Sequence, residues 1–152
     1  PAVLKSLVEA FIEAPLPIVC PLHPRTRKRL HQQRLWKKLS SSENVQIVPP
    51  LGYLDFLVLM KNCEMMLTDS GGLQEEATAP PIRKLVLVIR LSTDRPEAVE
   101  AGFARVVGVE KEKILAAMDQ TLKEKGELPP LSPYGDGSAG KRIVKIIMEE
   151  AF

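Results

Sequence analysis

The sequence predicts an α/β fold: a Rossmann-like, doubly wound and mostly parallel sheet with helices on both faces. Three observations support this prediction. Short apolar runs alternate with segments of helical spacing along most of the chain. Residues 85–89 are continuously apolar, as expected of a strand that helices cover on both faces. Residues 65–68 form another apolar run, and the turn Asp69-Ser70-Gly71-Gly72 and a helical pattern follow it directly.

The first half of the chain opens on a helical pattern, since Leu4, Leu7 and Phe11 share one face. Short apolar runs that end at proline-containing turns mark two strands. Thr26 is suited to cap the helix between these strands, and the serines at 40–42 end it. We therefore expect a helix at 4–11, a strand at 17–22, a helix at 26–39, a strand at 45–48 and a helix at 53–63.

The second half continues the same alternation. A helix is expected to start near Leu73, after the two glycines, and the loop at 91–95 leads to a short helix from Pro96. Ile114, Leu115 and Met118 have the spacing of one helical face. We expect strands at 65–68, 85–89 and 105–107, helices from 73, from 96, at 111–125 and at 141–152, and a loop at 126–140.

The composition excludes several classes of protein. Of the 152 residues, 45% are hydrophobic and 26% charged, which excludes a disordered chain and allows one domain with a substantial core. No apolar run approaches the roughly 18 residues of a membrane span, and no leader pattern marks secretion, so we expect a cytoplasmic location without a membrane partner. A net charge of +2 argues against a protein that mainly grips nucleic acid. Cys20 and Cys63 are expected to be reduced core thiols.

The turn at 69–72 is the clearest candidate for a binding site. Its glycines let a ligand approach the backbone, and the N–H groups and dipole of the following helix favour a phosphate. The hydroxyl of Ser70 adds a donor, and Glu76 can accept hydrogen bonds from sugar hydroxyls. A plain strand-to-helix turn capped by Ser70 explains the pattern equally well. Ser70 is not expected to be a nucleophile, because no Gly-x-Ser-x-Gly elbow surrounds it.

Three further side chains lie where strands of such a sheet end. His23 can hydrogen-bond a phosphate or move a proton, although an ordinary loop histidine is the commoner case. Phe56 can stack on a flat base, or it belongs to the core. Arg95 can point at the same rim, or it pairs with Asp94 or Glu97.

The segment 21–42 carries seven cationic residues and no acidic residue. This admits nucleic-acid binding, but Leu30, Leu35 and Trp36 form an apolar stripe, which favours a helix with a solvated basic face. The two cysteines and two histidines show no recognisable spacing of metal ligands. We therefore expect neither a metal site nor a cofactor.

Five blocks of sequence follow one another across nearly the whole chain. They are His23-Pro24-Arg25-Thr26-Arg27, Gly52-Tyr53-Leu54-Asp55-Phe56, residues 67–76, residues 95–102 and Pro133-Tyr134-Gly135-Asp136-Gly137. In order and rough spacing they resemble the C-terminal domain of the non-hydrolysing UDP-N-acetylglucosamine 2-epimerases. The resemblance implies a two-domain, glycosyltransferase-B-like enzyme with its active site between two Rossmann-like halves. It also implies that residues 1–152 form a single UDP-binding domain whose N-terminal partner domain lies outside this chain.

The resemblance further implies a reaction and a set of roles. The family interconverts UDP-N-acetylglucosamine and UDP-N-acetylmannosamine, by eliminating UDP to give a 2-acetamidoglucal and adding UDP back with the opposite configuration at C2. Such an isomerase serves cell-envelope polysaccharide biosynthesis. Carried over to this sequence, the turn Ser70-Gly71-Gly72 holds the diphosphate, Glu76 holds the ribose and Phe56 lies by the uracil. Arg95 and His23 face the diphosphate, and His23 also takes part in catalysis.

The chain departs from the family pattern at several places. Residues 78–83 replace a shorter, glycine-containing turn, Leu91 stands where an aspartate is usual, and Phe103 stands where a small polar residue is usual. The family's N-terminal half, with the acidic residues credited with the C2 proton transfers, has no counterpart, and neither does the first strand of this domain. We therefore expect the chain alone to be inactive, and its open sheet edge to favour a second copy or aggregation.

Other functions fit the same features. A hydrolysing epimerase or a glycosyltransferase of the same two-domain fold would share the nucleotide site, and product analysis distinguishes them, since free N-acetylmannosamine indicates hydrolysis. A non-catalytic nucleotide-binding module or a basic nucleic-acid-binding helix belongs to another class. The expected partners of the leading interpretation are UDP-N-acetylglucosamine or UDP, the N-terminal domain of the same enzyme and a second copy of the chain.

Overall fold

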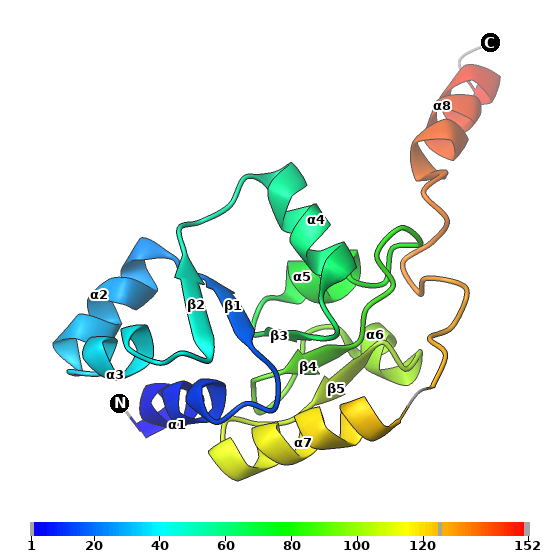
Figure 1. Ribbon diagram of the computed structural model, residues 1–152. Coiled ribbons are helices and arrows are strands. Elements are labelled where there is room, and N and C mark those ends of the chain that lie inside the picture. The colour runs from blue at the N-terminus through cyan, green and yellow to red at the C-terminus, as the bar shows by residue number, and fades with distance from the viewer. Residues whose placement is uncertain (1, 125, 151–152) are drawn as a thin grey trace.

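The computed structural model describes residues 2–124 and 126–150, and helices alternate with short strands along them (Figure 1). The helices are α1 (Ala2–Ile12), α2 (Pro24–Gln32), α3 (Trp36–Ser40), α4 (Tyr53–Asn62), α5 (Gly71–Glu76), α6 (Pro96–Glu100), α7 (Lys111–Lys123) and α8 (Ala139–Glu150). The strands are β1 (Ile18–Pro21), β2 (Val45–Val48), β3 (Met66–Thr68), β4 (Val86–Val88) and β5 (Ala104–Val106). Each strand lies within a residue or so of its predicted position.

The strands form two parallel ladders. In one ladder β1 pairs with β2, so that Ile18 lies opposite Val45. In the other the order is β3-β4-β5, with Met66 opposite Val86 and Val86 opposite Ala104. β1 lies between β2 and β3 (Figure 1), but among the described residues no ladder joins β1 to β3. The prediction of a parallel sheet is therefore confirmed in direction, and the sheet is divided in two.

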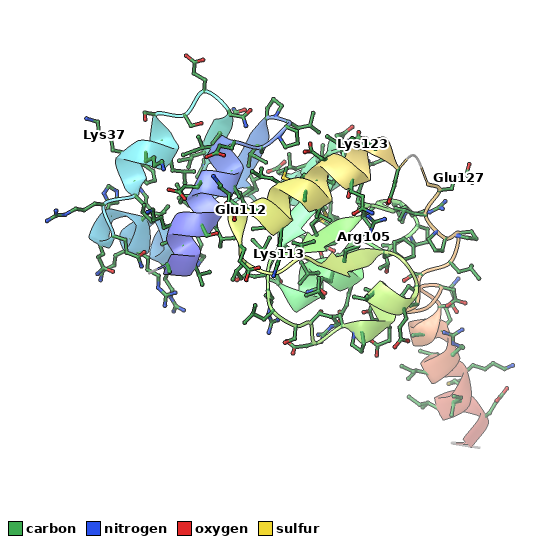
Figure 2. The ribbon with its side chains drawn as sticks, turned by 90° about the horizontal axis from the view of Figure 1, so that it is seen from below. Lys37, Arg105, Glu112, Lys113, Lys123 and Glu127 are labelled. Atoms are coloured by element: carbon green, nitrogen blue, oxygen red, sulfur yellow. The ribbon has the colours of Figure 1, made fainter. Side chains whose placement is uncertain are left out.

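Helices cover both faces of the β3-β4-β5 ladder. Val86 and Val88 point into a core cluster with Met60 of α4, Ala98 of α6 and Phe103. Their neighbour Leu87 points the other way, into a cluster with residues of α1 and α7. Seen from below, α7 lies beside α1 under the strands (Figure 2). The continuous apolar pattern of this strand follows from its burial on both faces.

A third core cluster joins the first helices to the β1-β2 ladder. Val8 of α1, Leu30 of α2, Leu39 of α3 and Val45 of β2 are all buried in it. The amide of Asn44 fastens the end of α1 by donating to backbone carbonyls there, including Ala14 O at 3.0 Å. As a result α1, α2 and α3 pack on one face of β1 and β2.

The helix predicted at 26–39 is two helices, which is a correction. The helix is interrupted between α2 and α3, where Arg34 adopts a left-handed conformation with φ 58°. The cap also differs, because His23 precedes α2 and its Nδ1 accepts a hydrogen bond from Arg25 N at 3.2 Å, while Thr26 lies inside the helix. The apolar stripe of this segment continues across the break, so the spacing alone concealed it.

The C-terminal segment ends in α8, which extends away from the body (Figure 1). The helix begins at Ala139, slightly before the predicted position, and the predicted ends at 125 and 152 fall outside the described residues. Five large apolar side chains of α8 are exposed: Ile143, Val144, Ile146, Ile147 and Met148. None of the described helices is long and apolar enough to cross a membrane.

Candidate functional site

The turn between β3 and α5 is held open by hydrogen bonds to its own backbone. Ser70 N donates to Thr68 Oγ1 at 3.1 Å, and the Ser70 side chain is exposed. The helix begins at Gly71, earlier than predicted, and neither Gly71 nor Gly72 has a positive φ. A Cβ at Gly72 would meet nothing closer than Ser70 Oγ at 4.0 Å. Glycine is thus not required by the backbone here, and it leaves open space beside the exposed serine.

Arg95 reaches the same turn from the loop after β4. Its guanidinium lies against Gly71, with Cζ 3.4 Å and Nη2 3.6 Å from the position that a Cβ would take. Nε donates to the Glu75 carboxylate, and Nη1 donates to the Asp94 carbonyl at 2.8 Å. The carboxylate partner is therefore Glu75, whereas Asp94 pairs with Arg90. Two of the predicted site segments, far apart in sequence, meet at one place.

Gln74 connects these two segments, and the sequence analysis did not single it out. Its side chain is 0% exposed. Nε2 donates to the Ser70 carbonyl at 3.3 Å, and Oε1 accepts from Thr93 Oγ1 at 2.5 Å. A buried amide requires partners, but the sequence carries no signal of this burial.

Tyr134 brings the loop after α7 to the same region. Burial raises the pKa of its phenol, and the charges of Glu97 and Glu75 add to the rise while Arg95 opposes it. Tyr134, in the fifth sequence block, therefore lies near the end of α5 and the start of α6. The same block contains Asp136, whose carboxylate accepts hydrogen bonds from the N–H and the hydroxyl of Ser138. These hydrogen bonds and the charge of Arg142 lower the pKa of Asp136 to about 2.

Glu76 and Phe56 occupy the helices beside the turn. Glu76 is half-buried in the last turn of α5. Phe56 is half-buried in the first turn of α4, and its ring packs against the core cluster that contains Val86 and Val88. Phe56 thus contributes to packing, and part of its ring is accessible to a ligand.

His23 stands apart from this cluster in its contacts. Its ring is exposed at the end of β1, and Nδ1 is occupied as an acceptor by Arg25 N, which places the ring proton on Nε2. Among the described residues no hydrogen bond links His23 to Ser70 or Arg95. The structure brings Ser70, Gly71 and Arg95 together, and it leaves His23 at the end of the other ladder.

The positions that depart from the resembled pattern differ in their surroundings. Phe103 is completely buried and fills the core beneath α6, and Leu91 is exposed on the loop. In the 78–83 segment, Thr78 Oγ1 lies 2.6 Å from Ser132 Oγ, and the Arg83 guanidinium donates to the Leu128 carbonyl. These two contacts anchor the loop at 126–138.

Cys20 and Cys63 are free and half-buried, and burial raises the pKa of both thiols. No group of three potential metal ligands occurs among the described residues. In the basic segment, the Arg27 guanidinium lies 4.6 Å from the centre of the Trp36 ring, and His31 stacks on the same ring. Part of the basic surface is thus engaged in packing.

Comparison with known proteins identifies a family. The model of the family described as UDP-N-acetylglucosamine 2-epimerase matches residues 2–148. The UDP-N-acetylglucosamine 2-epimerase of Methanocaldococcus jannaschii is 42% identical over 148 residues, which is 95% of this chain and 39% of that protein. The enzyme of the same name from Escherichia coli K12 is 42% identical over 134 residues, 86% of this chain and 34% of that protein. The chain thus spans between about a third and two fifths of the length of these relatives.

Solved structures agree with the fold. The Methanocaldococcus jannaschii UDP-GlcNAc 2-epimerase in complex with UDP-GlcNAc and UDP superposes with a TM-score of 0.85 at 40% identity, covering 97% of this chain and 41% of that one. The Neisseria meningitidis UDP-GlcNAc 2-epimerase bound to UDP-GlcNAc gives a TM-score of 0.79 at 36% identity, covering 97% of this chain and 40% of that one. The predicted α/β, Rossmann-like and glycosyltransferase-B-like fold is confirmed.

Proposed function

The chain belongs to the UDP-N-acetylglucosamine 2-epimerase family, and from this premise we propose that it is the UDP-binding, C-terminal half of an enzyme that interconverts UDP-N-acetylglucosamine and UDP-N-acetylmannosamine. One observation carries the proposal. The Ser70 turn and the Arg95 guanidinium meet beside an exposed hydroxyl and the start of a helix, which is an arrangement that suits a diphosphate. Relatives with the same family name have been solved with UDP-GlcNAc and UDP bound.

The proposed chemistry follows from where charge develops. Breaking the bond between sugar C1 and the diphosphate oxygen places negative charge on the departing UDP. The N–H groups of Gly71 and Gly72, the Ser70 hydroxyl and the Arg95 guanidinium would stabilise that charge. Glu76 would accept hydrogen bonds from the ribose hydroxyls, and Phe56 would lie against the uracil.

His23 would donate a hydrogen bond from Nε2 to the diphosphate, since Nδ1 is already an acceptor at the start of α2. Removal of the C2 proton needs a base, and its return on the opposite face needs an acid. The family resemblance assigns those roles to acidic residues outside this chain. Elimination followed by re-addition of UDP, without release of free sugar, is the non-hydrolysing form of the reaction.

The two ladders support the proposal that this domain is completed by a further segment. β1 connects to β2 through α2 and α3, which pack on the same face as α1. Crossovers between parallel strands are right-handed. If a strand preceded α1, the order strand-α1-β1 would therefore progress across the sheet in the same direction as β1 to β2. That strand would lie on the side of β1 away from β2, between β1 and β3. We infer that a parallel strand from the rest of the polypeptide joins the two ladders there.

The experiment is a fusion that places this chain after the part of the Methanocaldococcus jannaschii relative that the chain does not cover. The expected product from UDP-N-acetylglucosamine, followed by proton NMR, is UDP-N-acetylmannosamine. This chain alone and the relative's part alone are the controls and should be inactive. Free N-acetylmannosamine would instead indicate a hydrolysing enzyme. No turnover by a folded fusion that binds UDP would contradict the epimerase proposal.

A further inference from the structure

A continuous chain of hydrogen bonds runs between the two segments that meet at the site. Arg95 N donates to Thr93 Oγ1 at 3.1 Å, and Thr93 Oγ1 donates to Gln74 Oε1 at 2.5 Å. Gln74 Nε2 then donates to the Ser70 carbonyl at 3.3 Å, and Ser70 N donates to Thr68 Oγ1 at 3.1 Å. From Arg95 to Thr68, each of these hydrogen bonds is donated in the same direction.

Gln74, the middle residue of this series of hydrogen bonds, is completely buried. Gln74 is 0% exposed, Thr68 is 6% exposed, and every buried side-chain nitrogen and oxygen among the described residues has a hydrogen-bond partner. Burying an amide without partners would be costly, whereas a leucine would fill the same space without needing any. The polar side chain therefore has a consequence that packing alone does not supply: it ties the Ser70 turn to the loop that carries Arg95.

The tie fixes the position of both segments. The Ser70 carbonyl accepts twice from Gln74, from the backbone N at 3.4 Å and from Nε2 at 3.3 Å. On the other side, Thr93 holds the backbone N–H of Arg95, whose guanidinium lies against Gly71. The hydrogen bonds thus hold the backbone of the two residues, Ser70 and Arg95, whose side chains the proposed function assigns to the diphosphate.

We propose that Gln74 and Thr93 are positioning residues, which set the Ser70 turn and Arg95 at a fixed separation before the nucleotide arrives. The inference rests on the proposed function for the identity of the ligand. Binding groups that are already held in place lose less conformational freedom when the ligand binds, so the site has a higher affinity for the ligand. The effect should therefore appear in the diphosphate part of the ligand and not in the nucleoside part.

The test compares Thr93→Val with Thr93→Ser and Gln74→Met by calorimetric titration with UDP and with uridine. Thr93→Val and Gln74→Met keep the volume and remove the link, whereas Thr93→Ser keeps the hydroxyl. Thr121→Val is the matched control, because the Thr121 hydroxyl donates to the Ala117 carbonyl within α7, away from the site. We expect Thr93→Val and Gln74→Met to weaken UDP about 5- to 30-fold and uridine less than about twofold, with Thr93→Ser close to the parent.

A second readout does not depend on the ligand. Hydrogen exchange of the Ser70 amide, which contacts Thr68 and neither of the altered residues, should quicken in Thr93→Val and Gln74→Met and stay unchanged in Thr93→Ser and Thr121→Val. Unchanged Ser70 exchange together with unchanged UDP affinity would overturn the inference, and so would equal losses for UDP and uridine. If the parent does not distinguish UDP from uridine, the proposed function fails, and the Ser70 amide still decides whether the link exists.

Discussion

Replacing Arg95 by alanine is expected to weaken UDP binding strongly and to change stability little. The Arg95 side chain is 34% exposed and that of its partner Glu75 is 40% exposed, so the ion pair contributes less than about 1 kcal/mol to folding. A charged hydrogen bond from Arg95 to the diphosphate contributes about 1.5–3 kcal/mol. The expected loss of UDP affinity is therefore roughly 10- to 100-fold.

The chain offers a matched control for this variant. Arg105 pairs with Glu124 at side-chain exposures of 40% and 44%, on the α7 side of the fold (Figure 2). Arg105→Ala should change thermal stability as little as Arg95→Ala does, and it should leave UDP affinity as it is. Calorimetric titration and a thermal melt of both variants make the comparison. Equal effects of the two variants on UDP affinity would refute the assignment of Arg95 to the diphosphate.

Three further predictions concern the ribose, the base and the C-terminal helix. Glu76→Ala is expected to weaken UDP by about 1.5–3 kcal/mol in a titration, and an unchanged dissociation constant would remove the ribose role. Phe56→Ala should cost UDP affinity less, about 0.5–1.5 kcal/mol, and should lower the melting temperature because the ring packs against the core; an unaltered melting temperature would place the ring outside the core. The pKa of Asp136 is lowered to about 2 by its hydrogen bonds to Ser138. A lowered pKa stabilises the fold above the ordinary aspartate range, and that contribution is lost as the pH falls toward 2. The helical circular dichroism signal should fall over this window, because Ser138, the partner of Asp136, directly precedes α8. An identical acid transition in Asp136→Asn would contradict this contribution.

The elements and the meeting of two site segments were predictable because both depend on local patterns. Apolar runs located the strands, and parallel strands bring their following loops to one edge, so the Ser70 turn and Arg95 could be expected to converge. The ion partner of Arg95 was not predictable, since Glu75 lies 20 residues away in sequence and on another element. Nearby Asp94 pairs with Arg90 instead.

Other features depended on tertiary contacts that no periodicity reports. Gln74 looks like an ordinary helix residue until its burial is known. The break at Arg34 is hidden because apolar residues on both sides of it pack into one cluster. The resemblance led us to expect a missing first strand and an open sheet edge, but it did not indicate that the sheet is divided between β1 and β3.

The helix α8 exposes a wide apolar face. Its five large apolar side chains, Ile143, Val144, Ile146, Ile147 and Met148, cover more than half of the helix circumference. An apolar stripe this wide is suited to burial in a groove, and less to packing along the narrow seam of a helix pair.

The most direct test of the central claim is a calorimetric titration of the purified, folded chain with UDP, with uridine as the control. The account predicts that UDP binds at least tenfold more tightly than uridine, because charged hydrogen bonds from the Ser70 turn and Arg95 to the diphosphate are worth about 1.4 kcal/mol or more. The same titration on the fusion with the relative's N-terminal part should give the same preference. Equal affinity for UDP and uridine in both proteins would contradict a diphosphate site on these residues.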